Sequence, residues 1–136
     1  KRGMTGGEIL VEGNCGHEAG HAMRRGLIAV GRDLGDAAGF QMSGGTILAF
    51  GKLGVQAGAG LKRGTICWLG EGERPRILPT YQRSTRMSPV FLRVYVEHLR
   101  GLGFPVPEGC LESEYRRYCG DFLELGRGEI LLREAA

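Results

Sequence analysis

Glycine recurs with a fixed period of 19 residues through the first half of this 136-residue chain. Three columns keep this spacing without an insertion: Gly7, Gly26, Gly45 and Gly64; Gly16, Gly35 and Gly54; Gly20, Gly39 and Gly58. Isoleucine follows the same register at Ile9, Ile28, Ile47 and Ile66. A fixed period is typical of one supersecondary unit stacked on copies of itself, so it constrains the fold before any local motif does. We therefore interpret these glycines as structural residues of the repeat.

Each unit predicts a short strand rather than a helix. Gly7-Glu8-Ile9-Leu10-Val11 alternates with period two, as a strand with one apolar face does. A helix is disfavoured because each interior glycine costs roughly 1 kcal/mol relative to alanine. Short strands joined at glycine corners and stacked in register predict an all-β fold, a right-handed parallel β-helix of 19-residue coils.

The repeat ends near residue 72, which predicts two parts. Residues 1–72 are expected to form the β-helix coils, continuing a longer N-terminal solenoid before Lys1, and residues 73–136 a C-terminal appendage. Ser88-Pro89 predicts the start of a helix over 89–100, since serine caps helices and proline suits the first turn. Residues 111–119 predict a second short helix and 123–132 two terminal strands. Within those strands, 128–131 repeats the Gly-Glu-Ile-Leu motif of 7–10.

Composition narrows the class of protein and its compartment. A net charge of +3 is too small to indicate a nucleic-acid partner by itself. The sequence has no apolar run near 18 residues, so we expect no membrane partner. Cysteine occurs four times without a CxxC pair, at Cys15, Cys67, Cys110 and Cys119, which suits free thiols in a reducing compartment. We expect a cytoplasmic protein.

The segment His17-Glu18-Ala19-Gly20-His21 matches the HExxH motif of zinc hydrolases. That chemistry needs a helix, on which two histidines one turn apart bind zinc while the glutamate activates water. The 19-residue repeat already accounts for the glycines here, and the equivalent segments 34–39 and 53–58 carry no such residues. We therefore expect turn residues, with no catalytic residue and no metal. A zinc hydrolase, or a non-catalytic metal at Cys15, His17 and His21, is the weaker hypothesis.

Two sets of residues carry a resemblance to known families. The run Gly13-Asn14-x-Gly16-x-x-x-Gly20-x-x-Met23-x-x-Gly26-x-Ile28 resembles the GXGXG β-helix, found in the large subunit of glutamate synthase and in the third subunit of formylmethanofuran dehydrogenase. The tail favours the second family. Its motifs Ile77-Leu78-Pro79-Thr80-Tyr81, Pro89-x-Phe91-Leu92-x-x-Tyr95 and Tyr118-x-Gly120-Asp121 resemble the end of that third subunit and of its counterpart in the bacterial formyltransferase/hydrolase complex.

This resemblance implies a non-catalytic scaffold subunit in methanofuran- and tetrahydromethanopterin-linked one-carbon metabolism. It implies three other subunits as partners, which are amidohydrolase-like, molybdenum/tungsten-oxidoreductase-like and formyltransferase-like. The complex would use a methanofuran-type carrier and tetrahydromethanopterin, with metals on other subunits and no cofactor bound by this chain alone. The alternatives are the GXGXG domain of a glutamate synthase and a zinc hydrolase using HEAGH.

A basic stretch after the repeat offers candidate contacts. Its arginines suit carboxylates because the guanidinium forms paired hydrogen bonds with them. We therefore consider contacts with an acidic partner surface or with a polyglutamate tail on the carrier, against the alternative of ordinary surface ion pairs. The residues concerned are Arg74, Arg76, Arg83 and Arg86.

Overall fold

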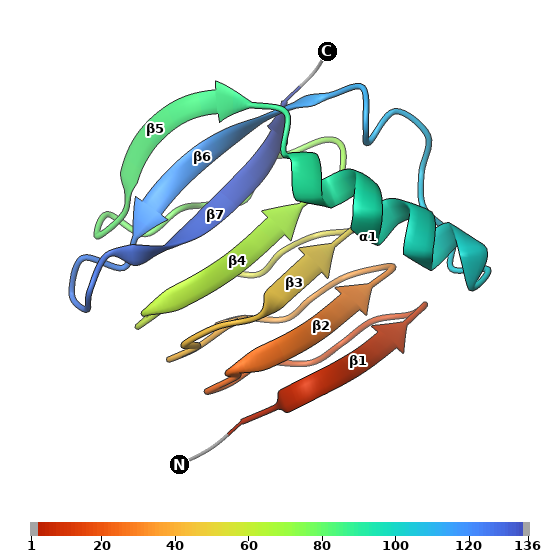
Figure 1. Ribbon diagram of the computed structural model, residues 1–136. Coiled ribbons are helices and arrows are strands. Elements are labelled where there is room, and N and C mark those ends of the chain that lie inside the picture. The colour runs from red at the N-terminus through yellow and green to blue at the C-terminus, as the bar shows by residue number, and fades with distance from the viewer. Residues whose placement is uncertain (1–2, 135–136) are drawn as a thin grey trace.

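The computed structural model describes residues 3–134, and Lys1, where an earlier solenoid is expected to join, lies outside this part. Over these residues the chain forms a seven-stranded mixed sheet in the order β1-β2-β3-β4-β7-β6-β5 and one helix, α1 (Figure 1). The elements are β1 (Thr5–Val11), β2 (Arg25–Val30), β3 (Thr46–Ala49), β4 (Arg63–Trp68), β5 (Gln82–Met87), α1 (Val90–Gly101), β6 (Glu114–Gly120) and β7 (Arg127–Glu134).

The predicted all-β, right-handed parallel β-helix is wrong. The strands form one open sheet that does not close into a coil, and its last three members, β7, β6 and β5, pair antiparallel. The rest of each 19-residue unit is turn, with isolated bridges at Cys15, Leu34 and Leu53 in place of further strands. Residues with positive φ, such as Ala37 (57°) and Gln41 (55°), interrupt any strand in these turns.

The 19-residue register is nevertheless visible in the parallel part of the sheet. Ile28 pairs with Ile47, and Ile47 with Ile66, so each strand is one repeat. β7 lies parallel to β4 with Gly64 beside Gly128 and Ile66 beside Ile130. The strand motif at 128–131 therefore continues the parallel stack.

Glycine is required where neighbouring units approach each other. Gly64 has φ of 111°, and a Cβ there would lie 2.8 Å from the Met42 methyl and 3.0 Å from the Gly45 carbonyl oxygen. Only glycine avoids both the strained φ and this close contact.

Two apolar layers cover the two faces of the parallel strands. On one face, Ile47 and Ile66 are fully buried with Met42 between the sheet and the turns. On the other face, Leu48 and Cys67 pack under α1, which contributes Leu92, Val96 and Leu99 (Figure 1). Both faces of β3 and of residues 66–68 of β4 are thus buried, which explains their near-continuous apolar sequence.

The appendage differs from the sequence-based expectation in two places. The helix predicted at 89–100 spans Val90–Gly101, and it has Pro89 as N-cap with no side-chain cap bond. The second helix predicted at 111–119 is wrong, because Glu114–Gly120 is strand β6, paired between β5 and β7. The two terminal strands predicted at 123–132 are one strand, β7, preceded by a turn. Within residues 3–134, no helix has the length and apolar character needed to cross a membrane.

Candidate functional site

The HEAGH segment forms a turn and not the helix that zinc hydrolases need. Glu18 and Ala22 both have φ of 56°, which a right-handed helix does not allow. The two histidines have separate partners. Nδ1 of His21 lies 2.9 Å from Oε1 of Glu18, whereas Nδ1 of His17 accepts a hydrogen bond of 2.8 Å from the Asp36 N–H.

The contact of His17 belongs to a ladder of polar side chains that follows the repeat. Each side chain accepts a hydrogen bond from the backbone N–H of the residue 19 positions later. The pairs are Asn14 with Asp33 (2.9 Å), Asp33 with Lys52 (3.0 Å), His17 with Asp36 (2.8 Å) and Asp36 with Val55 (2.9 Å). These side chains therefore satisfy the turn backbone of the next unit.

Cys15, His17 and His21 are not brought together as a metal site. Cys15 forms a bridge with Leu34 and packs against the core, whereas His17 is bonded to Asp36 and His21 contacts Glu18. Across residues 3–134, no three His, Cys, Asp or Glu side chains are grouped closely enough to hold a metal ion.

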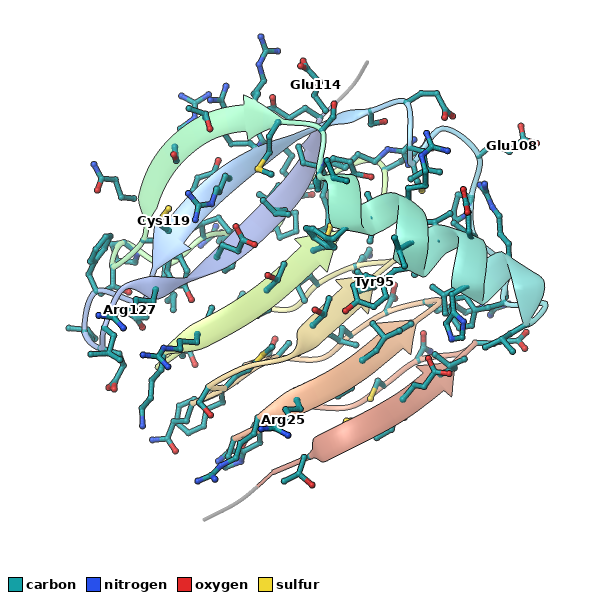
Figure 2. All side chains as sticks on the ribbon, in the orientation of Figure 1. Arg25, Tyr95, Glu108, Glu114, Cys119 and Arg127 are labelled. Atoms are coloured by element: carbon teal, nitrogen blue, oxygen red, sulfur yellow. The ribbon has the colours of Figure 1, made fainter. Side chains whose placement is uncertain are left out.

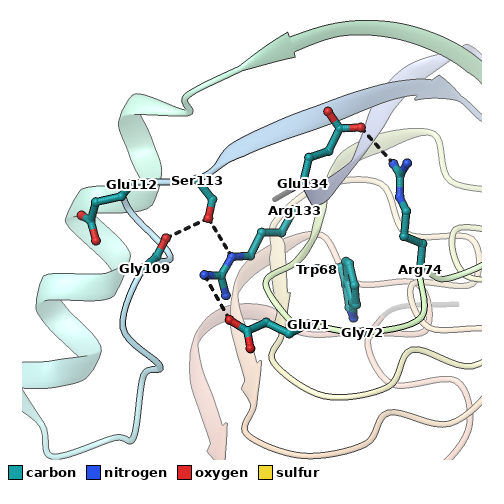
Figure 3. A pocket seen from close by; sticks show the side chains of 10 residues that line it. Trp68, Glu71, Gly72, Arg74, Gly109, Glu112, Ser113, Arg133 and Glu134 are labelled. Atoms are coloured by element: carbon teal, nitrogen blue, oxygen red, sulfur yellow. Dashed lines mark hydrogen bonds and ion pairs between the residues drawn. The ribbon is translucent and has the colours of Figure 1, made fainter. Parts of the chain in front are cut away.

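A cavity of about 620 Å³ opens beside the end of β4 (Figure 3). It lies between the loop after β4, the loop before β6 and the end of β7. Its lining residues are Trp68, Gly70, Glu71, Gly72, Arg74, Gly109, Glu112, Ser113, Arg133 and Glu134. It brings together segments that are about 60 residues apart in the sequence.

Arg133 contacts several of the segments that line this cavity. Its side chain is only 9% exposed, and its Nε donates to Oγ of Ser113 at 2.9 Å. Its Nη1 donates to the Leu69 carbonyl at 3.1 Å, and its Nη2 lies 3.5 Å from a Glu71 carboxylate oxygen (Figure 3). The guanidinium is therefore fully engaged in structural contacts rather than free to bind a ligand.

Glu134 forms ion pairs with arginines from three segments of the chain. Its carboxylate, 16% exposed, lies 3.4 Å from Arg74, 3.8 Å from Arg86 and 3.6 Å from Arg116. Of the four arginines considered as carrier or acidic-partner contacts, Arg74 and Arg86 are thus directed to an internal carboxylate. The other two, at positions 76 and 83, are exposed and form no ion pair among residues 3–134.

The buried thiols near the cavity are not activated. Burial raises the pKa of Cys67 well above its usual value. Burial also raises the pKa of Cys110, with the nearby Arg133 opposing this shift. A thiol held in its protonated form is a poor nucleophile, so Cys67 and Cys110 are suited to packing rather than to nucleophilic attack.

Little in the sequence predicts this cavity. Ser113, Arg133 and Glu134 belong to no motif, and they meet because β6 and β7 pair with β4 in one sheet. The available signal is the repeat of the strand motif at 128–131, which places the end of β7 beside the end of β4.

Comparison with solved structures shows an informative similarity to a chain of an enzyme complex. No family model and no curated protein matches the chain. A chain in the X-ray structure of the formyltransferase/hydrolase complex FhcABCD from Methylorubrum extorquens, in complex with methylofuran, is similar, with 31% sequence identity and a TM-score of 0.76. The match covers 99% of this chain, so it includes both the repeats and the appendage. It covers 49% of the other chain, so this chain spans about half the length of the protein it matches.

Proposed function

We propose that this chain is a non-catalytic, structural subunit of a formyltransferase/hydrolase complex, equivalent to the third subunit of formylmethanofuran dehydrogenase. The observation that carries the proposal is the match to a chain of FhcABCD, at 31% identity over 99% of this chain. The match includes the tail of the chain. The tail carries the motifs that favour this family over glutamate synthase.

The polar side chains of the fold are consistent with this role. The ladder headed by Asn14 and His17 is used to join successive turns. Charged side chains that line the cavity form the ion pairs Arg133–Glu71 and Arg74–Glu134. These contacts join segments of the chain to one another, which suits a structural role.

In the proposed complex, the chemistry lies on other chains. A formyl group would pass between a methanofuran-type carrier and tetrahydromethanopterin, and metals would lie on the amidohydrolase-like subunit. The remaining partners would be molybdenum/tungsten-oxidoreductase-like and formyltransferase-like subunits. Arg76 and Arg83, which are exposed, are the arginines we propose for contact with an acidic partner or with the carrier.

Affinity purification from the native organism tests this proposal. A tagged copy of the chain is expressed at its natural level, and co-purifying proteins are identified by mass spectrometry, with the tag alone as control. We expect amidohydrolase-like and formyltransferase-like subunits in constant ratio to the chain. Recovery of the chain by itself, or with glutamate synthase subunits, would contradict the proposal.

A further inference from the structure

The loop between β6 and β7 exposes three large apolar side chains within four residues. Phe122 is 53% exposed, Leu123 76% and Leu125 60%. The loop projects at the end of the sheet where β6 ends and β7 begins (Figure 1). Single exposed apolar side chains are ordinary on a protein surface, but a contiguous group indicates an interaction site.

The preceding residue, Asp121, holds this loop in one conformation. Its carboxylate is buried, and it accepts hydrogen bonds of 3.0 Å from both the Gly60 N–H and the Leu123 N–H. Its backbone carbonyl accepts from the N–H groups of Glu124 (2.9 Å) and Gly126 (3.2 Å). Although burial alone would raise the pKa of Asp121, the hydrogen bonds from Leu123 and Gly60 keep it below its usual value. A loop ordered in advance loses less entropy on binding than a mobile one.

The backbone at Gly126 supports the ring of Phe122. Gly126 has φ of 66°, and a Cβ there would lie 2.6 Å from a carbon of the Phe122 ring. The ring therefore rests against bare backbone, which fixes its position while leaving its outer face exposed.

Five exposed cations lie at the same end of the sheet, where the parallel strands begin. We call this set the basic edge: Arg24, Arg25, Lys62, Arg63 and Arg127. None of them forms an ion pair with any residue in the range 3–134. Arg63 and Arg127 are direct neighbours across β4 and β7, about 4.8 Å apart along the sheet, where like charges repel. Figure 2 shows Arg25 and Arg127 at this end of the strands.

The apolar loop adjoins the part of the basic edge that lies on β4 and β7. The Asp121 N–H donates to the Leu61 carbonyl at 3.0 Å, which places the loop beside Lys62. Arg127 follows directly after the last loop residue, Gly126. Three exposed apolar side chains, with the exposed carboxylate of Glu124 between Leu123 and Leu125, are thus bordered by the positive charges of Lys62 and Arg127.

We infer that this surface docks another protein subunit, through an apolar recess that receives Phe122, Leu123 and Leu125 and a rim of carboxylates that faces the basic edge. The inference rests on the proposed function, because a similar chain occurs in a multi-subunit complex. A second copy of this chain fits less well, since a two-fold contact would place the two basic edges against each other. An acidic partner also relieves the repulsion between Arg63 and Arg127.

Two variants of the tagged chain test the inference in the native organism. One replaces the apolar group (Phe122→Ser/Leu123→Ser/Leu125→Ser), and the other reverses charge on the basic edge (Lys62→Glu/Arg63→Glu). The matched controls change an exposed valine (Val55→Ser) and two cations elsewhere (Arg32→Glu/Lys52→Glu). Thermal melting of each purified chain checks that it is folded.

We expect each test variant to recover the formyltransferase-like and amidohydrolase-like subunits about tenfold less well than the wild type, as loss of a central contact region does. The controls should recover them at the wild-type level. Wild-type recovery by the folded apolar variant would overturn the inference while leaving the proposed function intact. If the wild-type chain recovers no such subunits, the proposed function itself fails.

Two measurements on the purified chain address the other possible occupants. Flotation with vesicles of phosphatidylcholine and phosphatidylserine should leave the chain unbound. Binding that both test variants lose would overturn the inference in favour of a membrane surface. Light scattering should give the monomer mass. A dimer that both test variants disrupt would overturn it in favour of a second copy.

Discussion

Replacing Asp121 by alanine should destabilise the protein through the loss of two specific hydrogen bonds. The buried carboxylate accepts from the Gly60 N–H, which belongs to the repeat, and from the Leu123 N–H, which belongs to the β6–β7 loop. The substitution removes the acceptor and leaves both donors without a partner. The loop would thereby lose its side-chain link to the turn that precedes β4.

The expected size of this effect follows from the number of bonds and their exposure. A hydrogen bond to a charged group contributes about 1.5–3 kcal/mol, so two contribute about 3–6 kcal/mol. Both bonds are only partly buried, so water can satisfy the freed N–H groups to some extent, and we expect a loss of roughly 2–4 kcal/mol. Because domains of this size are stable by about 5–15 kcal/mol, the variant should still fold. Its melting temperature should fall by roughly 6–20 °C.

Urea denaturation followed by circular dichroism measures this loss directly. Asp121→Asn, which keeps one carbonyl acceptor, should lose less stability than Asp121→Ala. The control Glu124→Ala changes an exposed carboxylate in the same loop and should stay within about 0.5 kcal/mol of the wild type. An Asp121→Ala variant as stable as that control would refute the role assigned to the carboxylate.

Three further predictions concern the same fold. Since the fold lowers the pKa of Asp121, its contribution to stability is present above about pH 4 and is lost as the pH falls through the lower folded pKa. Urea midpoints below about pH 4 should therefore fall more steeply for the wild type than for Asp121→Asn. Ile47→Ala, at a fully buried position between two equivalent isoleucines, should cost about 3–4 kcal/mol in urea unfolding, and a cost below about 1 kcal/mol would contradict the packed ladder. Gly58→Ala should cost at least about 2 kcal/mol, because φ there is 75° and the new Cβ would meet the Tyr81 hydroxyl. Gly6→Ala, whose Cβ would meet nothing within 4 Å, should melt close to the wild type.

The register of the parallel strands could be predicted from the sequence. Repeats of equal length place equivalent residues beside one another in neighbouring strands. The pairing of Ile28, Ile47 and Ile66 follows from their spacing alone. The return of the motif at 128–131 likewise predicts a strand of the same kind, and the structure places it beside β4.

The sequence did not predict correctly whether each 19-residue unit closes into a coil. Strand alternation is a local property, whereas the path between strands depends on the φ values of residues such as Ala37 and Gln41. Tyr115 and its neighbours carry no clear strand pattern, and β6 is a strand because β5 and β7 supply hydrogen bonds on both sides. Such non-local pairing overrides local propensity.

The charged cavity and the apolar loop were missed for a related reason. The Arg133–Glu71 and Arg74–Glu134 pairs join residues about 60 positions apart, so no local motif indicates them. Leu123 lies in the stretch predicted as strand, and its exposure becomes evident only once the hydrogen bonds of Asp121 place the loop outside the sheet.

The central claim is that this chain is a structural subunit of a formyltransferase/hydrolase complex, and deletion of its gene tests this most directly. The formyltransferase-like subunit is tagged and the assembly is sized by native mass spectrometry, with and without this chain. We predict that the full assembly is absent from the deletion strain and returns when the chain is re-expressed. An assembly of unchanged mass and composition in the deletion strain would contradict the claim.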